Sequence, residues 1–428
     1  MGMRQVHELR ERGVRAVILS YVDTAGINRV KTVPVNRLDD AVRWGVGISP
    51  VFDVFLSDDS VTGTDRLGGP DGDLRMRPDM DRLVVLAAQP GWAWAPADRF
   101  TQDGEPWVAD QRGFARRAVE RAAAEGVSFR MAIEVEWVVD PPEPTFASAY
   151  GMSRLVEFSD YARDILVALE EQGVQVEQLH PEYSAGQFEV SVAAADPVAA
   201  ADDSVLVRQT IRAVSRRHGL RVSFSPCPVF ETVGNGGHVH LSAWRGGVNL
   251  FEGFPERDGG YAAAGILHHL PALLALGTPS PAGYLRLVPS RWAGAFACWG
   301  VETRETALRF VPGTSGLSGA ANLEVKCFDL AANPYLLLGG LVAAAMSGLS
   351  ARRPLPPPVT GDPVLLPDAP RLPTSLDAAV EEFAGDAVLR AALGSVLFDA
   401  VVAVRRAEAA RFKGVADEEV AEALRWVY

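Results

Sequence analysis

Residues 129–139, with the sequence FRMAIEVEWVV, constrain the fold most, because apolar and polar residues alternate there as in a β-strand with one buried face. Side chains two residues apart in a strand lie on the same side, so Glu134 and Glu136 point together and the apolar residues between them point away. Two adjacent carboxylates are costly unless solvent, a counter-charge or a cation compensates them. Taken alone, such a pair is more often a solvated strand face than a metal site.

Two further pairs have similar spacing. Glu182 and Glu189, in HPEYSAGQFEVS, flank a glycine-containing turn that can bring two carboxylates around a bend. His238 and His240, in GNGGHVHLS, share one face of a strand, which suits a metal ion or a phosphate group. The alternative for the histidines is one imidazole in the core and the other in solvent.

Cationic residues follow in the next part of the chain. Arg286, Arg304 and Arg309 precede Glu324 and Lys326. An isolated arginine is usually a surface charge. Together with the carboxylates and histidines, however, these residues provide metal ligands and fixed positive charge, which phosphoryl transfer requires. The sequence contains no Walker A motif, kinase glycine-rich set or GxSxG elbow, so the common nucleotide-binding and hydrolase plans are unsupported.

Length and turn residues predict two parts with a boundary near residue 105, giving an N-terminal domain over residues 1–104 and a second domain over 105–428. Strands are expected at 16–22, 29–35 and 83–88, and a glycine-rich loop at 63–73. Helices are expected at 113–125, at 159–172 with Ser159 as the cap, at 202–218, and through the last fifty residues. A proline-rich linker, 354–373, is expected to cross the surface without helix or strand.

Charge and cysteine usage limit the partners and the compartment. The net charge of −13 argues against nucleic acid as a partner, although a few arginines in a cleft can still bind small anions. The chain lacks an uninterrupted apolar run of roughly 18 residues, and the most apolar stretch, 336–349, suits a buried helix better than a membrane span. Three widely spaced cysteines and an N-terminus without an apolar segment predict a cytoplasmic protein with unpaired thiols.

A series of segments, in this order, resembles the glutamine synthetase family: AIEVEW, EYSAGQFEVS, GNGGHVHLSAW, RLVPSRWAGAFACWG, ETRETALR and NLEVKCFDLAANPYL. The resemblance covers nearly the whole chain and is strongest from residue 132 to residue 348. The later segments are most similar to the nodulin and fungal developmental-regulator branch, which shares the WxGAxxxWGxExRExxLR and NxExKxxDxxANPYL patterns. Several motifs in one order are far more specific than any one of them.

The resemblance implies an α+β protein with an N-terminal β-grasp domain followed by a catalytic domain, an open antiparallel β-barrel flanked by helices. It further implies ATP and two or three divalent metal ions, Mg²⁺ or Mn²⁺, in each active site. One metal would be bound by Glu136, Glu182 and Glu189, and another by Glu134, His238 and Glu324.

The same resemblance assigns the groups that contact nucleotide and substrate. His240 would lie near the nucleotide phosphates, and Gly236 would belong to the loop beside the substrate amino acid. Arg286 would bind the substrate carboxylate, and Arg304 and Arg309 would contact ATP phosphates and the acyl-phosphate. In the family, the N-terminal domain lends a loop to the neighbouring active site, which implies a homo-oligomeric ring, typically a dodecamer.

The departures from the family pattern concern the amine. Where glutamine synthetases have a catalytic glutamate that helps to deprotonate ammonium, the sequence has Trp292, which is bulky and cannot accept a proton. The FDGSS-like loop that supplies an aspartate for ammonium is absent, and VFDVFLSDDSVTG stands in its place without a clear counterpart among Asp53, Asp58 and Asp59. Two arginine positions around Glu324 are occupied by Asn322 and Lys326, the latter expected at the substrate.

The sequence therefore favours an ATP-dependent amide-forming ligase that phosphorylates the side-chain carboxylate of glutamate, or of a similar acid, and transfers it to an organic amine other than ammonia. The apolar Trp292 favours an alkyl or aryl amine over a polyamine, which would call for carboxylates. Two alternatives remain: a true glutamine synthetase with a relocated base, and a catalytically silent scaffold or regulator. The full set of candidate metal ligands argues against the silent alternative.

Overall fold

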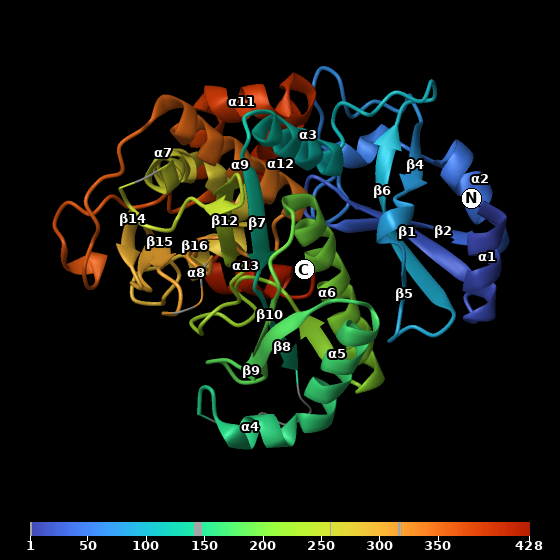
Figure 1. Ribbon diagram of the computed structural model, residues 1–428, viewed down its shortest axis with the longest axis horizontal. Helices are drawn as coiled ribbons and strands as arrows, with labels where there is room; N and C mark the ends of the chain where they lie inside the picture. The colour runs from blue at the N-terminus through green and yellow to red at the C-terminus, as the bar shows by residue number, and fades with distance from the viewer. Residues whose placement is uncertain (1, 141–147, 257, 316, 318) are drawn as a thin grey trace.

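The computed structural model describes residues 2–140, 148–256, 258–315, 317 and 319–428. The fold is of the α+β class, as predicted. Figure 1 shows an N-terminal β-rich part, in blue, beside the sheets and helices formed by the remaining chain. The predicted boundary near residue 105 stays a prediction.

The N-terminal sheet has the strand order β2-β1-β6-β4-β3, with β5 paired to β6. Strand β1 runs antiparallel to β2 and parallel to β6. Its buried side chains, with those of the helices α1 (Gly2–Glu11) and α2 (Leu38–Trp44), form a core cluster of their own. The strands are β1 (Ala16–Val22), β2 (Asn28–Pro34), β3 (Val46–Ile48), β4 (Leu74–Pro78), β5 (Val84–Val85) and β6 (Trp92–Phe100).

Two sheets follow. The first has the order β11-β8-β10-β9, and its strands are β8 (Val135–Asp140), β9 (Val176–Pro181), β10 (Gln187–Val192) and β11 (Arg221–Ser223). The second has the order β13-β12-β16-β15-β14, with β7 paired to β12. Its strands are β7 (Ser128–Ile133), β12 (Val239–Arg245), β13 (Val248–Asn249), β14 (Phe296–Val301), β15 (Thr306–Val311) and β16 (Asn322–Val325). All their pairings are antiparallel except that of β14 with β15, which is parallel.

Helices flank these sheets (Figure 1). They are α3 (Gln111–Ala124), α4 (Met152–Glu157), α5 (Ser159–Glu171), α6 (Pro197–Arg217), α7 (Asp258–Gly277), α8 (Pro281–Arg286), α9 (Pro334–Ala351), α10 (Leu376–Gly385), α11 (Ala387–Leu393), α12 (Ser395–Arg411) and α13 (Asp417–Leu424). The C-terminal segment is therefore helical, as predicted.

Two of these helices are long and apolar enough to cross a membrane by length and composition alone. In α7 and α9, the most apolar 18-residue windows are 83% and 78% buried inside the protein. The two helices pack against each other, with Gly265 of α7 against Gly348 of α9 in close backbone contact. Their apolar character is therefore accounted for by the core, as expected for residues 336–349.

Several predicted boundaries are wrong. The strand expected at 83–88 is only β5, because the chain turns after Val85 and Trp92 N donates to the Gln89 oxygen. Helix α5 has Phe158 rather than Ser159 at its N-cap. Helix α6 begins at Pro197, five residues before the predicted start at residue 202, and Asp196 caps it by accepting from Val198 N.

The proline-rich linker is more ordered than expected. It contains a short 3₁₀ helix, Pro363–Leu365, and makes backbone hydrogen bonds next to β14: Val359 N donates to the Trp299 oxygen, and Ala297 N to the Pro370 oxygen. Trp299 Nε1 also donates to the Pro356 oxygen at 2.7 Å. Prolines accept hydrogen bonds through their carbonyls although they cannot donate, so this segment can border a strand without becoming one.

Candidate active site

The strand predicted over residues 129–139 is interrupted at Glu134. Residues before it form β7, which pairs with β12, whereas residues after it form β8, which pairs with β10 and β11. Glu134 itself donates its backbone N–H to the His238 oxygen at 2.9 Å. The prediction of one continuous strand is wrong, because the chain passes from one sheet to the other here. Glu134 and Glu136 nevertheless line the same cavity.

This cavity has a volume of about 660 Å³. Of the residues predicted for the site, it is lined by Glu134, Glu136, Glu182, Glu189, His238, His240, Arg286, Trp292, Arg304, Arg309, Glu324 and Lys326. Residues separated by up to 192 positions in the chain, from Glu134 to Lys326, thus meet in one place. Sequence order alone could not place them together.

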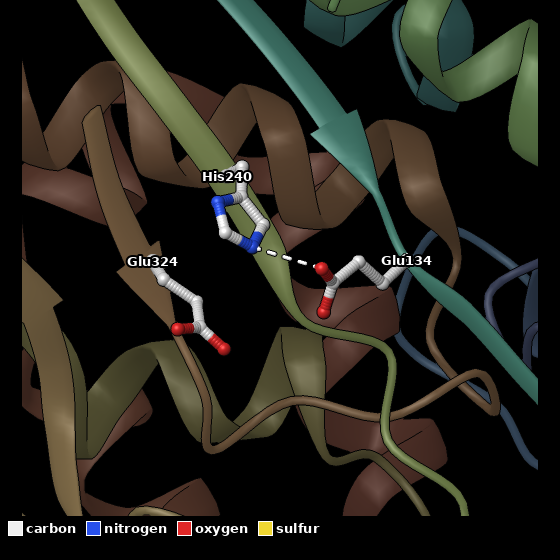
Figure 2. Close-up of side chains that lie close together, drawn as sticks. All are labelled: Glu134, His240 and Glu324. Atoms are coloured by element: carbon white, nitrogen blue, oxygen red, sulfur yellow. Dashed lines mark ion pairs between the residues drawn. The ribbon is translucent and has the colours of Figure 1, made fainter. Parts of the chain in front are cut away.

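Glu134, His240 and Glu324 form one group of potential metal ligands, each with an atom within 4.8 Å of the others (Figure 2). His240 lies opposite Glu324 in the β12–β16 pairing, and its Nε2 is 3.1 Å from Glu134 Oε1. His238 borders the same carboxylates, with Nδ1 3.0 Å from Glu134 Oε2 and 3.6 Å from Glu324 Oε1.

The β9–β10 hairpin provides a second group of potential ligands: His180, Glu182 and Glu189. His180 Nδ1 is 3.5 Å from Glu182, and its Nε2 is 3.4 Å from Glu189. Tyr150 donates its hydroxyl to Glu182 Oε1 at 2.5 Å. The turn between the strands therefore brings the two carboxylates together, as the sequence suggested.

The two groups fit divalent cations. Their donors are carboxylate oxygens and imidazole nitrogens, which Mg²⁺ and Mn²⁺ accept. Burial raises the pKa of both Glu136 and Glu189, and the negative charge of neighbouring carboxylates adds to this effect, giving a pKa of about 7 for each. Burial also opposes the ionisation of Glu324, but Lys326 and the histidines lower its pKa to about 2. Bound cations would compensate the buried negative charge. The division of ligands between two metals stays a prediction.

The predicted cationic residues differ in their surroundings. Arg286 is buried, with Nη2 3.0 Å from His238 Nε2 and Nη1 donating to the Phe328 oxygen at 3.3 Å. Glu324 accepts from Arg309 Nη1 at 2.8 Å and from Lys326 Nζ at 3.0 Å. Arg304 is exposed at the cavity wall. Their roles toward nucleotide and substrate stay predictions.

Gly236 lies behind the cavity, where its backbone N–H donates to Glu136 Oε2 at 2.8 Å. A Cβ at this position would lie 2.5 Å from His238 Nε2 and 2.9 Å from Arg286 Nη2. Only glycine therefore lets the backbone approach this closely. The residue fits the predicted loop beside the substrate, although it does not itself line the cavity.

Trp292 stands at the wall of the cavity on a turn with unusual backbone geometry. Both Ser290 and Trp292 have positive φ, 59° and 53°. The buried Glu305 holds the turn, accepting from Trp292 N at 2.8 Å and from Ser290 N at 3.2 Å. The indole is 42% exposed, and its ring centroid is 4.6 Å from that of Tyr183. An aromatic pair therefore occupies this wall.

Sequence reasoning missed several residues of the site. They are Tyr150, His180, Tyr183 and Arg291, which line the cavity, and Gln187 and Glu305, which support it. His180 had a usable signal, because it precedes Glu182 by the same two-residue spacing that selected His238 and His240. Glu305 had none, since its partners are backbone N–H groups in a turn.

The N-terminal aspartates are engaged elsewhere. Asp53 is fully buried and accepts from Arg99, Trp107 and Gln111. Asp58 pairs with Arg411, and Asp59 pairs with Arg29. None of the three lines the cavity of its own chain.

The glutamine synthetase N-terminal domain model matches residues 1–107, and the glutamine synthetase catalytic domain model matches residues 108–422. The chain is 59% identical over an alignment of 443 residues to the gamma-glutamylpolyamine synthetase GlnA3 of Streptomyces coelicolor, covering 98% of this chain and 95% of that protein. It is 30% identical over 416 residues to the glutamine synthetase of Thermococcus kodakarensis, covering 92% and 89% of the two chains.

Solved structures agree with these matches. A crystal structure of a novel glutamine synthase homolog superposes with a TM-score of 0.89 at 32% identity, covering 97% of this chain and 99% of that one. A complex of GmaS with ADP has a TM-score of 0.85 at 27% identity, covering 96% of each chain. The catalytic-domain match implies the use of ATP and a divalent metal ion. The chain belongs to the glutamine synthetase family and is an ATP-dependent carbon–nitrogen ligase that acts on a small carboxylate and an amine.

Proposed function

We propose that this enzyme joins the side-chain carboxylate of glutamate to a polyamine, with ATP as the phosphoryl donor and Mg²⁺ or Mn²⁺ as the metal. The observation that carries the proposal is the 59% identity, across 98% of the chain, to a protein named as a gamma-glutamylpolyamine synthetase. The aromatic residue Trp292 at the cavity wall supports an amine larger than ammonia.

The choice of a polyamine reverses the preference for alkyl or aryl amines drawn from Trp292 alone. An aromatic face attracts an alkylammonium group through cation–π interaction, so an aromatic wall is compatible with a charged amine. Trp292 and Tyr183 offer two such faces with centroids 4.6 Å apart, and Tyr150 packs edge-on against Tyr183 at 5.7 Å. The methylene chain of a polyamine can also bury apolar surface against these rings.

The remaining residues suit the transfer of a phosphoryl group. The carboxylate and histidine groups around Glu324 and Glu189 would hold the metal ions, which neutralise phosphate charge when bound. Arg304, Arg309 and Arg286 line the same cavity. Arg304 and Arg309 would bind phosphate oxygens, and Arg286 would bind the substrate carboxylate. Holding carboxylate and amine close in a partly enclosed cavity favours amide formation over hydrolysis.

The proposal includes a homo-oligomeric ring, a dodecamer by family expectation, in the cytoplasm. Every residue that lines the cavity in the described part of the chain lies at or beyond Glu134. The N-terminal domain thus contributes no side chain to the cavity of its own chain, which suits its contributing to that of a neighbouring subunit.

The three cysteines, Cys227, Cys298 and Cys327, are buried free thiols, which suits a reducing compartment.

The test is phosphate release from ATP with glutamate and either Mg²⁺ or Mn²⁺, in the presence of ammonium, alkyl amines, aryl amines, linear diamines or polyamines. Mass spectrometry identifies the amide. We expect stimulation by polyamines and little by ammonium. Stimulation by ammonium alone would establish the glutamine synthetase alternative. No amide with any amine, despite bound metal and nucleotide, would support a silent homologue or a different acid.

Replacing Trp292 by Ala is expected to raise the KM for the polyamine by about fivefold or more, because an aromatic contact with a cation contributes on the order of 1 kcal/mol or more. Trp292→Glu is expected instead to permit some use of ammonium, since a carboxylate can accept its proton. Steady-state kinetics with both amines measures the effect. Trp44→Ala and Trp44→Glu, at an exposed tryptophan on α2, are the matched controls. Unchanged polyamine kinetics in Trp292→Ala, together with no ammonium use in Trp292→Glu, would remove the assigned role of Trp292.

A further inference from the structure

A second cavity, separate from the active site, lies where the β1–β2 turn, α6 and the last residues of the chain meet. Its volume is about 240 Å³. None of its residues lines the active-site cavity, and none is acidic. They are Gly26, Ile27, Asn28, Val30, Val205, Arg208, Gln209, Arg212, Val427 and Tyr428. We refer to this space as the α6 cavity.

Two arginines with like charge, Arg208 and Arg212, line the α6 cavity. Arg208 and Arg212 are four residues apart on α6 and therefore lie on one face of the helix. Arg208 donates Nη1 to the Leu330 oxygen at 2.8 Å and Nε to the Ser204 oxygen at 3.3 Å. The guanidinium of Arg212 lies over the ring of Phe224, 4.9 Å from its centroid.

Neither arginine has a carboxylate partner among the residues that the structure describes. By contrast, Arg29, Arg82, Arg99 and Arg112 each pair with an aspartate. Burial lowers the pKa of both Arg208 and Arg212, and the charge of Arg212 lowers that of Arg208 further, to about 10. Two like charges that are partly withdrawn from water are unfavourable unless an anion compensates them.

We propose that the α6 cavity binds a small anion through Arg208 and Arg212, with a carboxylate or phosphate group between the two guanidinium groups. Guanidinium groups match these anions in geometry and retain their charge when partly buried. The volume suits inorganic phosphate or a small dicarboxylate, being below that of typical pockets for larger organic ligands. Asn28 lines the same cavity, and its side-chain NH₂ group is a hydrogen-bond donor that an anion could accept from.

Arg212 is the better residue to change, because Arg208 also donates to the Leu330 oxygen. Leu330 lies in the loop between β16 and α9, and this loop supports the active site. The Phe328 oxygen in that loop accepts from Gly237 N at 3.0 Å and from Arg286 Nη1 at 3.3 Å. A substitution of Arg208 would therefore disturb two places at once. Arg216→Gln is a matched control, because Arg216 is exposed on the same helix one turn further on.

The experiment is isothermal titration of the full-length protein with inorganic phosphate and, separately, with succinate, in saturating Mg²⁺ and ADP to occupy the nucleotide end of the active site. We expect one of these anions to bind to the unchanged protein and to Arg216→Gln with equal affinity. We expect Arg212→Gln to weaken this binding by about tenfold or more, and Arg212→Lys to retain part of it. Circular dichroism checks that each variant is folded.

Two outcomes would overturn the proposal. The first is that neither anion binds, or that Arg212→Gln and Arg212→Lys bind it as tightly as the unchanged protein does. The second is that anion binding is unchanged in Arg212→Gln while sedimentation shows a smaller assembly at equal protein concentration. In that case the anion that compensates Arg212 is a carboxylate of a second copy of this chain rather than a small molecule.

Discussion

Replacing Glu324 by Gln is expected to lower the rate of ATP-dependent amide formation by more than about 100-fold, since even groups that only orient metal ligands contribute 10- to 100-fold. Glu324 lies with Glu134 and His240 in one potential metal site and has both oxygens in use. Glutamine keeps the size of the side chain but removes its charge, so the cation would lose a ligand. The measurement is amide formation at saturating substrates, together with Mn²⁺ affinity by electron paramagnetic resonance.

Glu170→Gln is the matched control for this experiment, because Glu170 is an exposed residue near the end of α5. Its activity and Mn²⁺ affinity are expected to equal those of the unchanged enzyme. Loss of activity in Glu324→Gln with unchanged Mn²⁺ affinity would show that Glu324 acts through Arg309 and Lys326 rather than through a metal. Full activity would remove Glu324 from the catalytic machinery altogether.

Replacing Arg99 by Met is expected to lower the free energy of unfolding by about 3–5 kcal/mol, the usual effect of removing one partner from a buried ion pair. Arg99 is 1% exposed and donates to Asp110 at 2.9 Å, to Asp53 at 2.6 Å and to Gln111 at 2.6 Å. Methionine fills much of the space but leaves Asp53 and Asp110 buried without their cation. Urea unfolding at one fixed protein concentration measures the change, because subunit association also affects apparent stability.

Arg75→Met is the control for the Arg99 experiment. Arg75 lies on β4, the strand next to that of Arg99, and donates to Gln102 in an exposed position. Its replacement is expected to change the free energy of unfolding by no more than about 0.5 kcal/mol. If both variants had similar stability, the buried network would be no more stabilising than a surface contact. A second test adds Asp53→Asn to Arg99→Met, which should restore part of the loss by removing an unpaired charge.

Glu324→Gln and Arg99→Met both change buried charges, but the first is expected to affect catalysis and the second the stability of the fold. Around Glu324, several carboxylates lie close together with histidine and cationic neighbours, an arrangement suited to binding a cation. Around Arg99, the charges are already matched within the chain, and Asp53 is held there rather than at the active site. Of the three N-terminal aspartates, Asp53 is thus committed to the buried network of Arg99.

Much of the chain's local structure followed from its residue pattern. The short β-branched run Ala16–Val22 formed a strand with those bounds, and the apolar stretch around residues 336–349 formed the buried helix α9. Two boundaries were predicted wrongly although their signals are local. The start of α6 depends on Asp196 and Pro197, and the short β5 depends on a turn that reverses the chain after Val85.

The sequence by itself determined the family, through ordered motifs, and the kinds of side chain available for metal and phosphate binding. Only the tertiary structure decided how they meet. It breaks the strand at Glu134 so that Glu134 and Glu136 lie between two sheets, and it brings His180 to Glu189 across a hairpin. It also joins Glu134 to His240 and Glu324, because the pairing of β12 with β7 and β16 aligns distant segments. Periodicity fixes the direction of a side chain on its own strand, whereas distances between strands depend on sheet pairing and packing across the whole molecule.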